Sequence, residues 1–182
     1  MTRYRDPLIL LEGPDGAGKT TLMETLTARL RERHITCSTH HSGVPTVHPM
    51  VEYVEVLLRL HDAQVPAVVD RLHLGEQTYG HIVRGNDQLG RKGVYAIDRL
   101  ITRLFNPLLV IVLPPRDVAF QNWVKRKGQE YVKDEDKYMR IYEGFNDAVS
   151  LLPRVYYDYT STEAAELVDR MVVHLIAGRK DP

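Results

Sequence analysis

The sequence has little cysteine, no net charge and no long apolar run. Cys37 is the one cysteine among 182 residues, so the chain cannot form an internal disulfide, as is usual in a reducing compartment. Its 24 basic residues balance 24 acidic ones, which argues against a protein that coats nucleic acid through its net charge. The longest apolar segments have the length of strands, so we expect no membrane-spanning helix.

The order of the apolar segments predicts an α/β fold. Segments with strand character alternate with segments whose apolar residues recur at helical spacing. We expect strands at 7–12, 35–40, 66–70, 108–113 and 155–159, and helices near 22–30, 48–61, 72–83, 93–105, 117–151 and 162–177. The strands lack a period of two, as expected when helices cover both faces of a sheet. The prediction is one domain over residues 1–182 with three layers, α/β/α, around a five-stranded parallel sheet.

The segment GPDGAGKTT, from Gly13 to Thr21, predicts a nucleotide site. It contains the pattern G-x-x-x-x-G-K-[ST] between a predicted strand and a predicted helix. In this pattern backbone N–H groups surround phosphate oxygens, Lys19 neutralises their charge and the Thr20 hydroxyl holds Mg²⁺. The predicted ATP-binding residues are Gly13, Asp15, Gly16, Ala17, Gly18, Lys19, Thr20 and Thr21.

The phosphate loop alone does not name the reaction, because GTPases, motor ATPases and small-molecule kinases all use it. The sequence lacks the Asn-Lys-x-Asp motif with which GTPases bind guanine. The chain is also short for a large remodelling ATPase. Among these classes of protein, a compact kinase that phosphorylates a small acceptor remains.

A second polar pair follows another predicted strand. Asp70 and Arg71 end the segment VVDR, about fifty residues after Lys19, where parallel sheets bind their ligands. Asp70 suits a water molecule bound to Mg²⁺ or the orientation of an acceptor, and Arg71 suits a phosphate clamp. The alternative is a helix cap at Asp70 and a surface ion pair at Arg71.

Together these motifs resemble the thymidylate kinase group of nucleoside monophosphate kinases, especially its short phage-type members. The resemblance rests on EGPDGAGKTT, on VVDRLHLGEQTYG and on Leu113–Phe145, and it runs in order from Leu8 to about Phe145. It implies phosphoryl transfer from ATP with Mg²⁺ and a helical lid at about 116–145. It implies that Asp15 contacts the acceptor sugar and that Arg71 grips the acceptor phosphate.

The resemblance also places a lid cation at Lys125–Lys127, with Arg126 as the preferred residue. Arg116 and Arg140 are weaker candidates. A basic lid supplies charge to the transferring group and keeps water out when it closes. The alternative is a solvated basic helix end.

The acceptor pocket is predicted from Glu76, Tyr79 and Arg84, which follow Asp70 at roughly helical spacing. They suit a sugar hydroxyl, a stacked ring and a base edge or phosphate, although an ordinary amphipathic helix has the same pattern. The segment before Asp70 is short for the thymidylate kinase group. Tyr53 and Arg59 are the candidates there for contacts with the base.

Two aromatic or imidazole-rich segments remain. His40, His41 and His48 suggest a metal at first sight, but neither cysteine nor carboxylate lies among them, so we favour an acceptor-side loop. The turn Tyr159–Thr162 is a candidate border of the adenine site. Phe120 and Trp123 are expected to be core contacts of the lid.

We therefore predict an ATP- and Mg²⁺-dependent kinase of a deoxynucleoside monophosphate, with dTMP or a 5-modified dUMP as the acceptor. Lys19, Asp70, Arg71 and Arg126 are the predicted catalytic residues, and Thr20 and Asp70 the predicted Mg²⁺ site. The alternatives are a deoxynucleoside kinase, a kinase of a hydroxymethylated base in DNA, and a nucleotide-dependent binding switch. We expect a small-molecule acceptor and no nucleic acid or membrane partner. We also expect a homodimer, formed through the apolar side of the predicted helix Gly93–Phe105. The expected location is the cytoplasm, that of the host if the protein is viral.

Overall fold

The computed structural model describes residues 5–128 and 131–177. Five parallel strands form one sheet in the order β2-β3-β1-β4-β5. The strands are β1 (Asp6–Glu12), β2 (Ser38–His41), β3 (Ala67–Asp70), β4 (Phe105–Val112) and β5 (Arg154–Tyr157). This sheet confirms the predicted five-stranded parallel arrangement.

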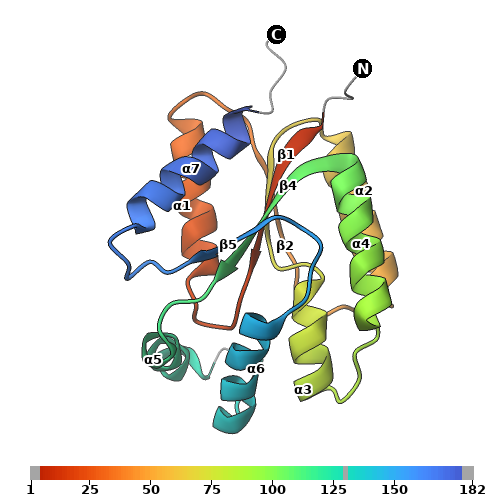
Figure 1. Cartoon of the computed structure of the whole chain (residues 1–182), viewed down its shortest axis with the longest axis vertical. Helices are drawn as coiled ribbons and strands as arrows, with labels where there is room; N and C mark the ends of the chain where they lie inside the picture. Colours follow the sequence, from red (N-terminus) through yellow and green to blue (C-terminus); the bar gives the residue numbers. More distant parts are fainter. Residues whose placement is uncertain (1–4, 129–130, 178–182) are drawn as a thin grey trace.

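Helices cover both faces of the sheet, so the fold has three layers (Figure 1). One face is covered by α1 (Lys19–Arg31) and α7 (Ala164–Ala177), and the other by α2 (Pro49–Asp62) and α4 (Gly90–Leu104). Alternate residues of β1 enter two separate cores. Leu8 and Leu10 belong to the core beneath α2 and α4, while Ile9 and Leu11 belong to the core beneath α1 and α7. Burial on both faces explains why the strands read as continuous apolar runs.

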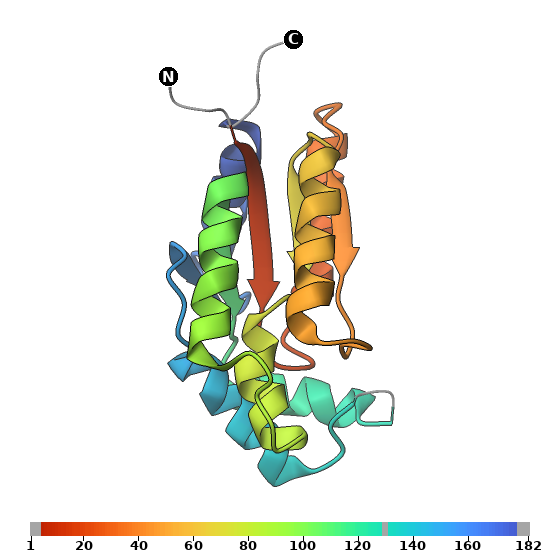
Figure 2. The same ribbon diagram turned by 90° about the vertical axis from the view of Figure 1, so that its right-hand side faces the viewer.

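The remaining helices gather at the carboxyl ends of the strands. They are the π-helix η1 (Glu76–Gly80), α3 (His81–Val83), α5 (Arg116–Arg126) and α6 (Glu135–Asp147). Both ribbon views place them together at one end of the molecule (Figures 1 and 2). The phosphate loop, which follows β1, ends at the same place. This end of the sheet is therefore where a ligand site can form.

Two predicted helical segments differ in detail from the structure. The segment 72–83 is helical from Leu74 onward through η1 and α3 to Val83. Its first residues are not helical, and the backbone N–H groups of Leu72 and Leu74 donate to the Glu12 side chain at 2.9 and 3.1 Å. The segment 117–151 contains two helices, because α5 ends at Arg126 and the Asp134 side chain caps a new helix by accepting from the Lys137 N–H at 2.8 Å.

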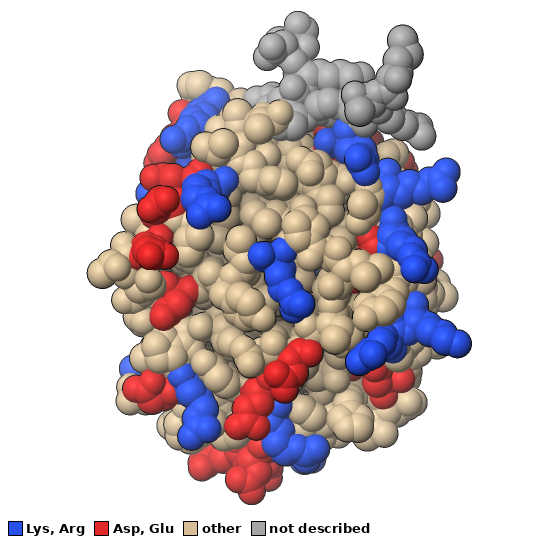
Figure 3. Space-filling view, in the orientation of Figure 1, with Lys and Arg blue, Asp and Glu red and all other residues tan. Residues whose placement is uncertain are grey.

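The apolar stripe of α4 faces the protein's own sheet. Ile97 and Ile101 are buried in the core beneath α2 and α4. The stripe that we considered for a dimer contact is therefore already covered. On the face shown in Figure 3, charges of both signs lie around the rim, and basic side chains gather over α4. In the described ranges, every helix is too short or too polar to span a bilayer.

Candidate active site

The phosphate loop has a backbone that requires glycine. Gly13, Gly16 and Gly18 have φ angles of +148°, +73° and +93°, which side chains disfavour. A Cβ atom on Gly13 would lie 2.3 Å from the carbonyl oxygen of Val112, so the loop also passes too close to β4 for a larger residue. Gly18 directly precedes α1. The N–H groups at the start of this helix, and its positive dipole end, therefore face the loop, as anion binding requires.

Lys19 is buried within the loop that it follows. Its ammonium group donates to the carbonyl oxygens of Gly13 and Pro14 at 2.8 and 2.6 Å. Burial, and then the Arg71 guanidinium, lower the pKa of this ammonium to about 7. A nearby anion would stabilise the charged form. The environment of Lys19 is therefore suited to a group that carries several negative charges.

Thr20 and Asp70 meet at the carboxyl ends of β1 and β3. The Thr20 hydroxyl donates to Asp70 Oδ2 at 2.8 Å, and His41 Nδ1 lies 3.1 Å from the same oxygen. Asp70 Oδ1 is buried and accepts no hydrogen bond from the described residues. A hydroxyl and a carboxylate with an unused oxygen are ligands that suit Mg²⁺. The two residues predicted for the metal thus lie in direct contact.

Arg71 and Asp15 form a second pair. Their guanidinium and carboxylate groups are ion-paired, and the Arg71 N–H donates to the Leu11 carbonyl at 2.9 Å. Arg71 has a φ of +68°, a left-handed conformation that is uncommon for a residue with a long side chain. The ion pair and the backbone bond hold it in that conformation.

A cavity of about 160 Å³ opens beside this pair. Asp15 and Arg71 line one part of it, and Tyr53, Glu76 and Tyr79 line its buried wall. Burial raises the pKa of both tyrosine hydroxyls, so they stay protonated.

Glu76 and Arg84 form an ion pair in the wall of this cavity. The structure therefore brings Glu76, Tyr79 and Arg84 together with Asp15 and Arg71, as the predicted acceptor pocket requires. Tyr53 also lines the cavity, but Arg59 lies on the exposed side of α2, where its guanidinium is 3.3 Å from His40 Nδ1.

His40 and His41 end β2, and His48 directly precedes α2. The three histidines have different contacts. His40 Nε2 lies 3.1 Å from the Ser42 hydroxyl, and His41 contacts Asp70. His48 caps α2, because its Nδ1 accepts from the Met50 N–H at 3.2 Å. Ser42, Gly43 and Pro45 from the connection between β2 and α2 line the cavity, as expected for an acceptor-side loop.

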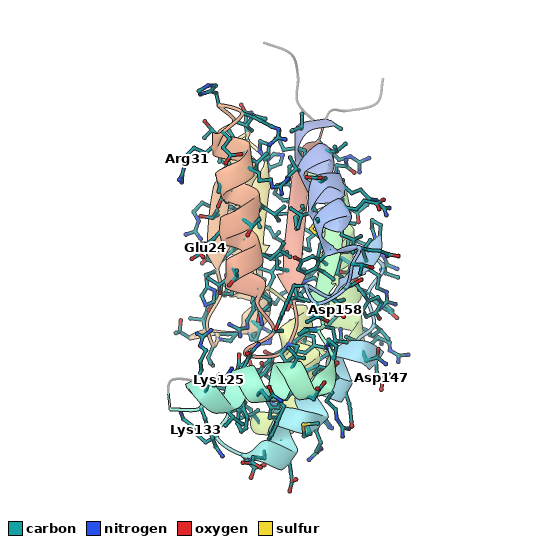
Figure 4. The ribbon with its side chains drawn as sticks, turned by 90° about the vertical axis from the view of Figure 1, so that its left-hand side faces the viewer. Glu24, Arg31, Lys125, Lys133, Asp147 and Asp158 are labelled. Atoms are coloured by element: carbon teal, nitrogen blue, oxygen red, sulfur yellow. The ribbon has the colours of Figure 1, made fainter. Side chains whose placement is uncertain are left out.

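Helix α5, in the segment predicted to be a lid, lies beside the phosphate loop. Arg126 lines two adjoining hollows, one with Lys19 and Arg71 and one with Lys125 and Tyr159. Figure 4 shows Lys125 on α5, at the end of the molecule beyond α1. The other cations have separate contacts. The Lys127 ammonium lies 5.0 Å from the Trp123 ring centre and 3.3 Å from a Glu135 oxygen. The Arg116 guanidinium lies 3.8 Å from a Glu143 oxygen, and Arg140 is exposed on α6.

Comparison with known proteins supports this geometry. No protein-family model matches the chain. A thymidylate kinase of Mycoplasma pneumoniae is 27% identical over 125 residues, which are 69% of this chain and 53% of that protein. The match thus spans about half of the relative's length.

Two solved structures share the fold. One is the YorR protein of Bacillus subtilis in complex with phosphorylated GDP, with a TM-score of 0.68, 18% identity, and coverage of 96% of this chain and 99% of that chain. The other is deoxyadenosine kinase of M. mycoides with bound dATP, with a TM-score of 0.56, 12% identity, and coverage of 90% and 98%. The chain is thus similar in sequence to a thymidylate kinase and shares its fold with these two proteins.

Sequence reasoning missed three sets of buried polar contacts in this fold. Glu12 accepts the two N–H groups that shape the turn after Asp70, and His73 Nε2 donates to Asp98 at 2.7 Å. Tyr138 in α6 donates its hydroxyl to the Asp15 carbonyl oxygen at 3.0 Å. Each pair joins distant parts of the chain, and a search for local motifs does not connect them.

Proposed function

We propose that this protein is an ATP- and Mg²⁺-dependent kinase of a deoxynucleoside monophosphate, with dTMP or a 5-modified dUMP as the acceptor. The observation that carries the proposal is the position of Arg71. Arg71 lines both the hollow beside Lys19 and the cavity that contains Glu76 and Tyr79. A cation at the junction of a donor site and an acceptor site suits an acceptor that carries its own phosphate.

The donor phosphates would bind to the loop Gly13–Thr21 and to Lys19. Thr20 and Asp70 would hold Mg²⁺, directly or through water, and the ion would neutralise charge on the donor phosphates. This assignment rests on the contact between their oxygens and on the unused Asp70 Oδ1. The Lys19 ammonium, whose pKa is low in the protein alone, would become fully charged next to the phosphates.

The acceptor would lie in the cavity with its phosphate at Arg71 and its sugar near Asp15. Glu76, Tyr79 and Arg84 would contact the remainder of the nucleotide. Arg126, from the lid, would stabilise charge on the transferring group, because it faces the same hollow as Lys19. Reaction by direct transfer needs alignment and charge neutralisation, and these residues supply both.

Tyr159 would border the adenine ring. It lines the hollow beyond Arg126, and Asn122 donates to its hydroxyl at 2.7 Å. The Gly18 backbone lies directly against its ring, because a Cβ atom on Gly18 would lie 3.2 Å from Tyr159 Cε1. A ring fixed in this way offers a flat apolar surface next to the phosphate loop.

A deoxynucleoside kinase is the second candidate, because deoxyadenosine kinase shares the fold. That reaction requires a base that removes the proton of a 5′-hydroxyl. Of the two candidate carboxylates, Glu76 is ion-paired with Arg84, and Asp70 is the residue that we assign with Thr20 to Mg²⁺. A nucleoside monophosphate kinase does not need a free carboxylate as a base, so we favour that function.

The test is a panel of acceptors with Mg-ATP and detection of products by mass. The panel contains four dNMPs, 5-hydroxymethyl-dUMP, four deoxynucleosides and an oligonucleotide that contains hydroxymethyluracil. We expect a diphosphate product that Arg71→Ala reduces at least a hundredfold, while Arg103→Ala, an exposed arginine on α4, changes nothing. Phosphate on a nucleoside or on the oligonucleotide alone would overturn the proposal.

A further inference from the structure

The peptide units of Asp15 are held from two sides. The Asp15 N–H donates to the Tyr79 hydroxyl at 3.0 Å, and the Asp15 carbonyl oxygen accepts from the Tyr138 hydroxyl at 3.0 Å. Both hydrogen bonds are buried. Tyr79 belongs to η1 in the wall of the acceptor cavity, whereas Tyr138 belongs to α6 of the lid. The loop acid is thus attached to both neighbouring elements.

The lid packs directly on the loop at this position. A Cβ atom on Gly16 would lie 2.8 Å from the backbone nitrogen of Trp123, so the backbone of α5 touches the loop. The Trp123 ring stacks on Tyr138, with ring centres 4.6 Å apart and an angle of 20° between the planes. This stack fixes the Tyr138 ring, and the ring directs its hydroxyl at Asp15.

The Asp15 side chain faces the acceptor side. It lines the cavity and is ion-paired with Arg71, but it is not among the residues that line the hollow beside Lys19. A rotation of the Asp15 peptide would therefore move the partner of the acceptor clamp before it moved the donor site.

We propose that Tyr138 is a positioning residue that couples the lid to the acceptor site through the Asp15 peptide. With the lid against the loop, the Tyr138 hydroxyl holds the Asp15 carbonyl, and Asp15 in turn holds Arg71 in its left-handed conformation. When α6 moves away, this bond breaks, and the acceptor clamp loses one of its restraints. The proposal rests on the proposed function for its consequence in catalysis, but not for the coupling itself.

The chain offers a matched pair of variants on the same helix. Tyr138→Phe removes the hydroxyl but keeps the ring on Trp123. Tyr142→Phe, one helical turn later, removes a hydroxyl that also donates to a backbone carbonyl, that of Pro114 at 2.8 Å. Loss of one hydrogen bond of ordinary strength corresponds to a change of about fivefold. We expect Tyr138→Phe to lower kcat/KM for the acceptor about fivefold, with the KM for ATP changed less than twofold, and Tyr142→Phe to change neither.

A second measurement tests the coupling without catalysis. Amide hydrogen exchange of Asp15 and Gly16, followed by NMR in the full chain, should become faster in Tyr138→Phe and stay as in the wild type in Tyr142→Phe. If the wild type phosphorylates none of the panel, the proposed function fails and the exchange result alone decides the coupling. Equal responses to the two variants, or a Tyr138→Phe protein that differs only in melting temperature, would overturn the proposal.

Discussion

Replacing the buried Asp98 by alanine should remove the acceptor of three hydrogen bonds, of which the one from His73 is buried. Asp98 Oδ1 accepts from His73 Nε2 at 2.7 Å, and Oδ2 accepts from the Leu151 N–H at 2.7 Å and from the Ser150 hydroxyl at 3.0 Å. The side chains of Asp98 and His73 are both fully buried. These bonds join α4 to the turn after β3 and to the segment that follows α6.

The variant leaves the buried His73 without its partner, and the cost of removing one member of a buried pair is about 3–5 kcal/mol. A loss of that size is a large part of the total of roughly 5–15 kcal/mol that stabilises a domain. Urea denaturation followed by far-UV circular dichroism would measure it. With a slope of about 2 kcal/mol/M, the midpoint should fall by about 2 M.

The matched control is Asp169→Ala. Asp169 is also ion-paired, with Arg29, but its side chain is 61% exposed, whereas that of Asp98 is 0% exposed. An exposed pair contributes about 0.2–1 kcal/mol, so this control should hardly move the midpoint. If Asp98→Ala cost no more than Asp169→Ala, the reading of the Asp98 cluster as a main tertiary link would be refuted.

Two further predictions concern the phosphate loop. Gly16→Ala should destabilise the fold by at least the roughly 1–2 kcal/mol that a left-handed residue costs, because Gly16 has a φ of +73° and the new Cβ atom would also meet the backbone of α5. A shift in Trp123 fluorescence and a lower melting temperature would report this loss. An unchanged melting temperature would contradict the prediction. Burial raises the pKa of the Glu12 carboxyl, so the folded chain keeps a proton there that the unfolded chain releases. The contribution of Glu12 to stability is therefore present below its unfolded pKa and is lost as pH rises through the folded pKa. Glu12→Gln should flatten that fall in the free energy of unfolding measured against pH, and parallel curves for the two proteins would speak against it.

The sheet and the phosphate loop could be predicted because their signals are local. A strand with both faces buried is a short apolar run, and GPDGAGKTT contains every residue that the loop needs. The helix predicted at 72–83 begins two residues later in the structure, at Leu74, for the opposite reason. Its first N–H groups bond to Glu12, about sixty residues earlier, and a local apolar pattern contains no information on that competitor.

The same limit applies to the candidate site. Asp15, Asp70 and Arg71 could be selected because each stands at the end of a predicted strand or in the loop, where a parallel sheet gathers its ligand residues. Tyr138 could not be selected, because its partner Asp15 lies 123 residues away and a tyrosine in an amphipathic helix looks like a core residue. The stack on Trp123 shows that it is a core residue as well. Its hydroxyl also bonds to Asp15, and it can do so only when the lid is folded over the loop.

The left-handed conformation of Arg71 depends on several of these contacts. Strained residues persist where the surroundings outweigh a cost of about 1–3 kcal/mol, and they gather at functional sites. Here the surroundings are the Leu11 carbonyl, which accepts the Arg71 N–H, and the Asp15 carboxylate, which pairs with its guanidinium. Asp15 is itself held by Tyr79 and Tyr138. The restraint on Arg71 therefore comes from the sheet, the acceptor cavity and the lid together, so a movement of the lid changes the balance that keeps Arg71 strained.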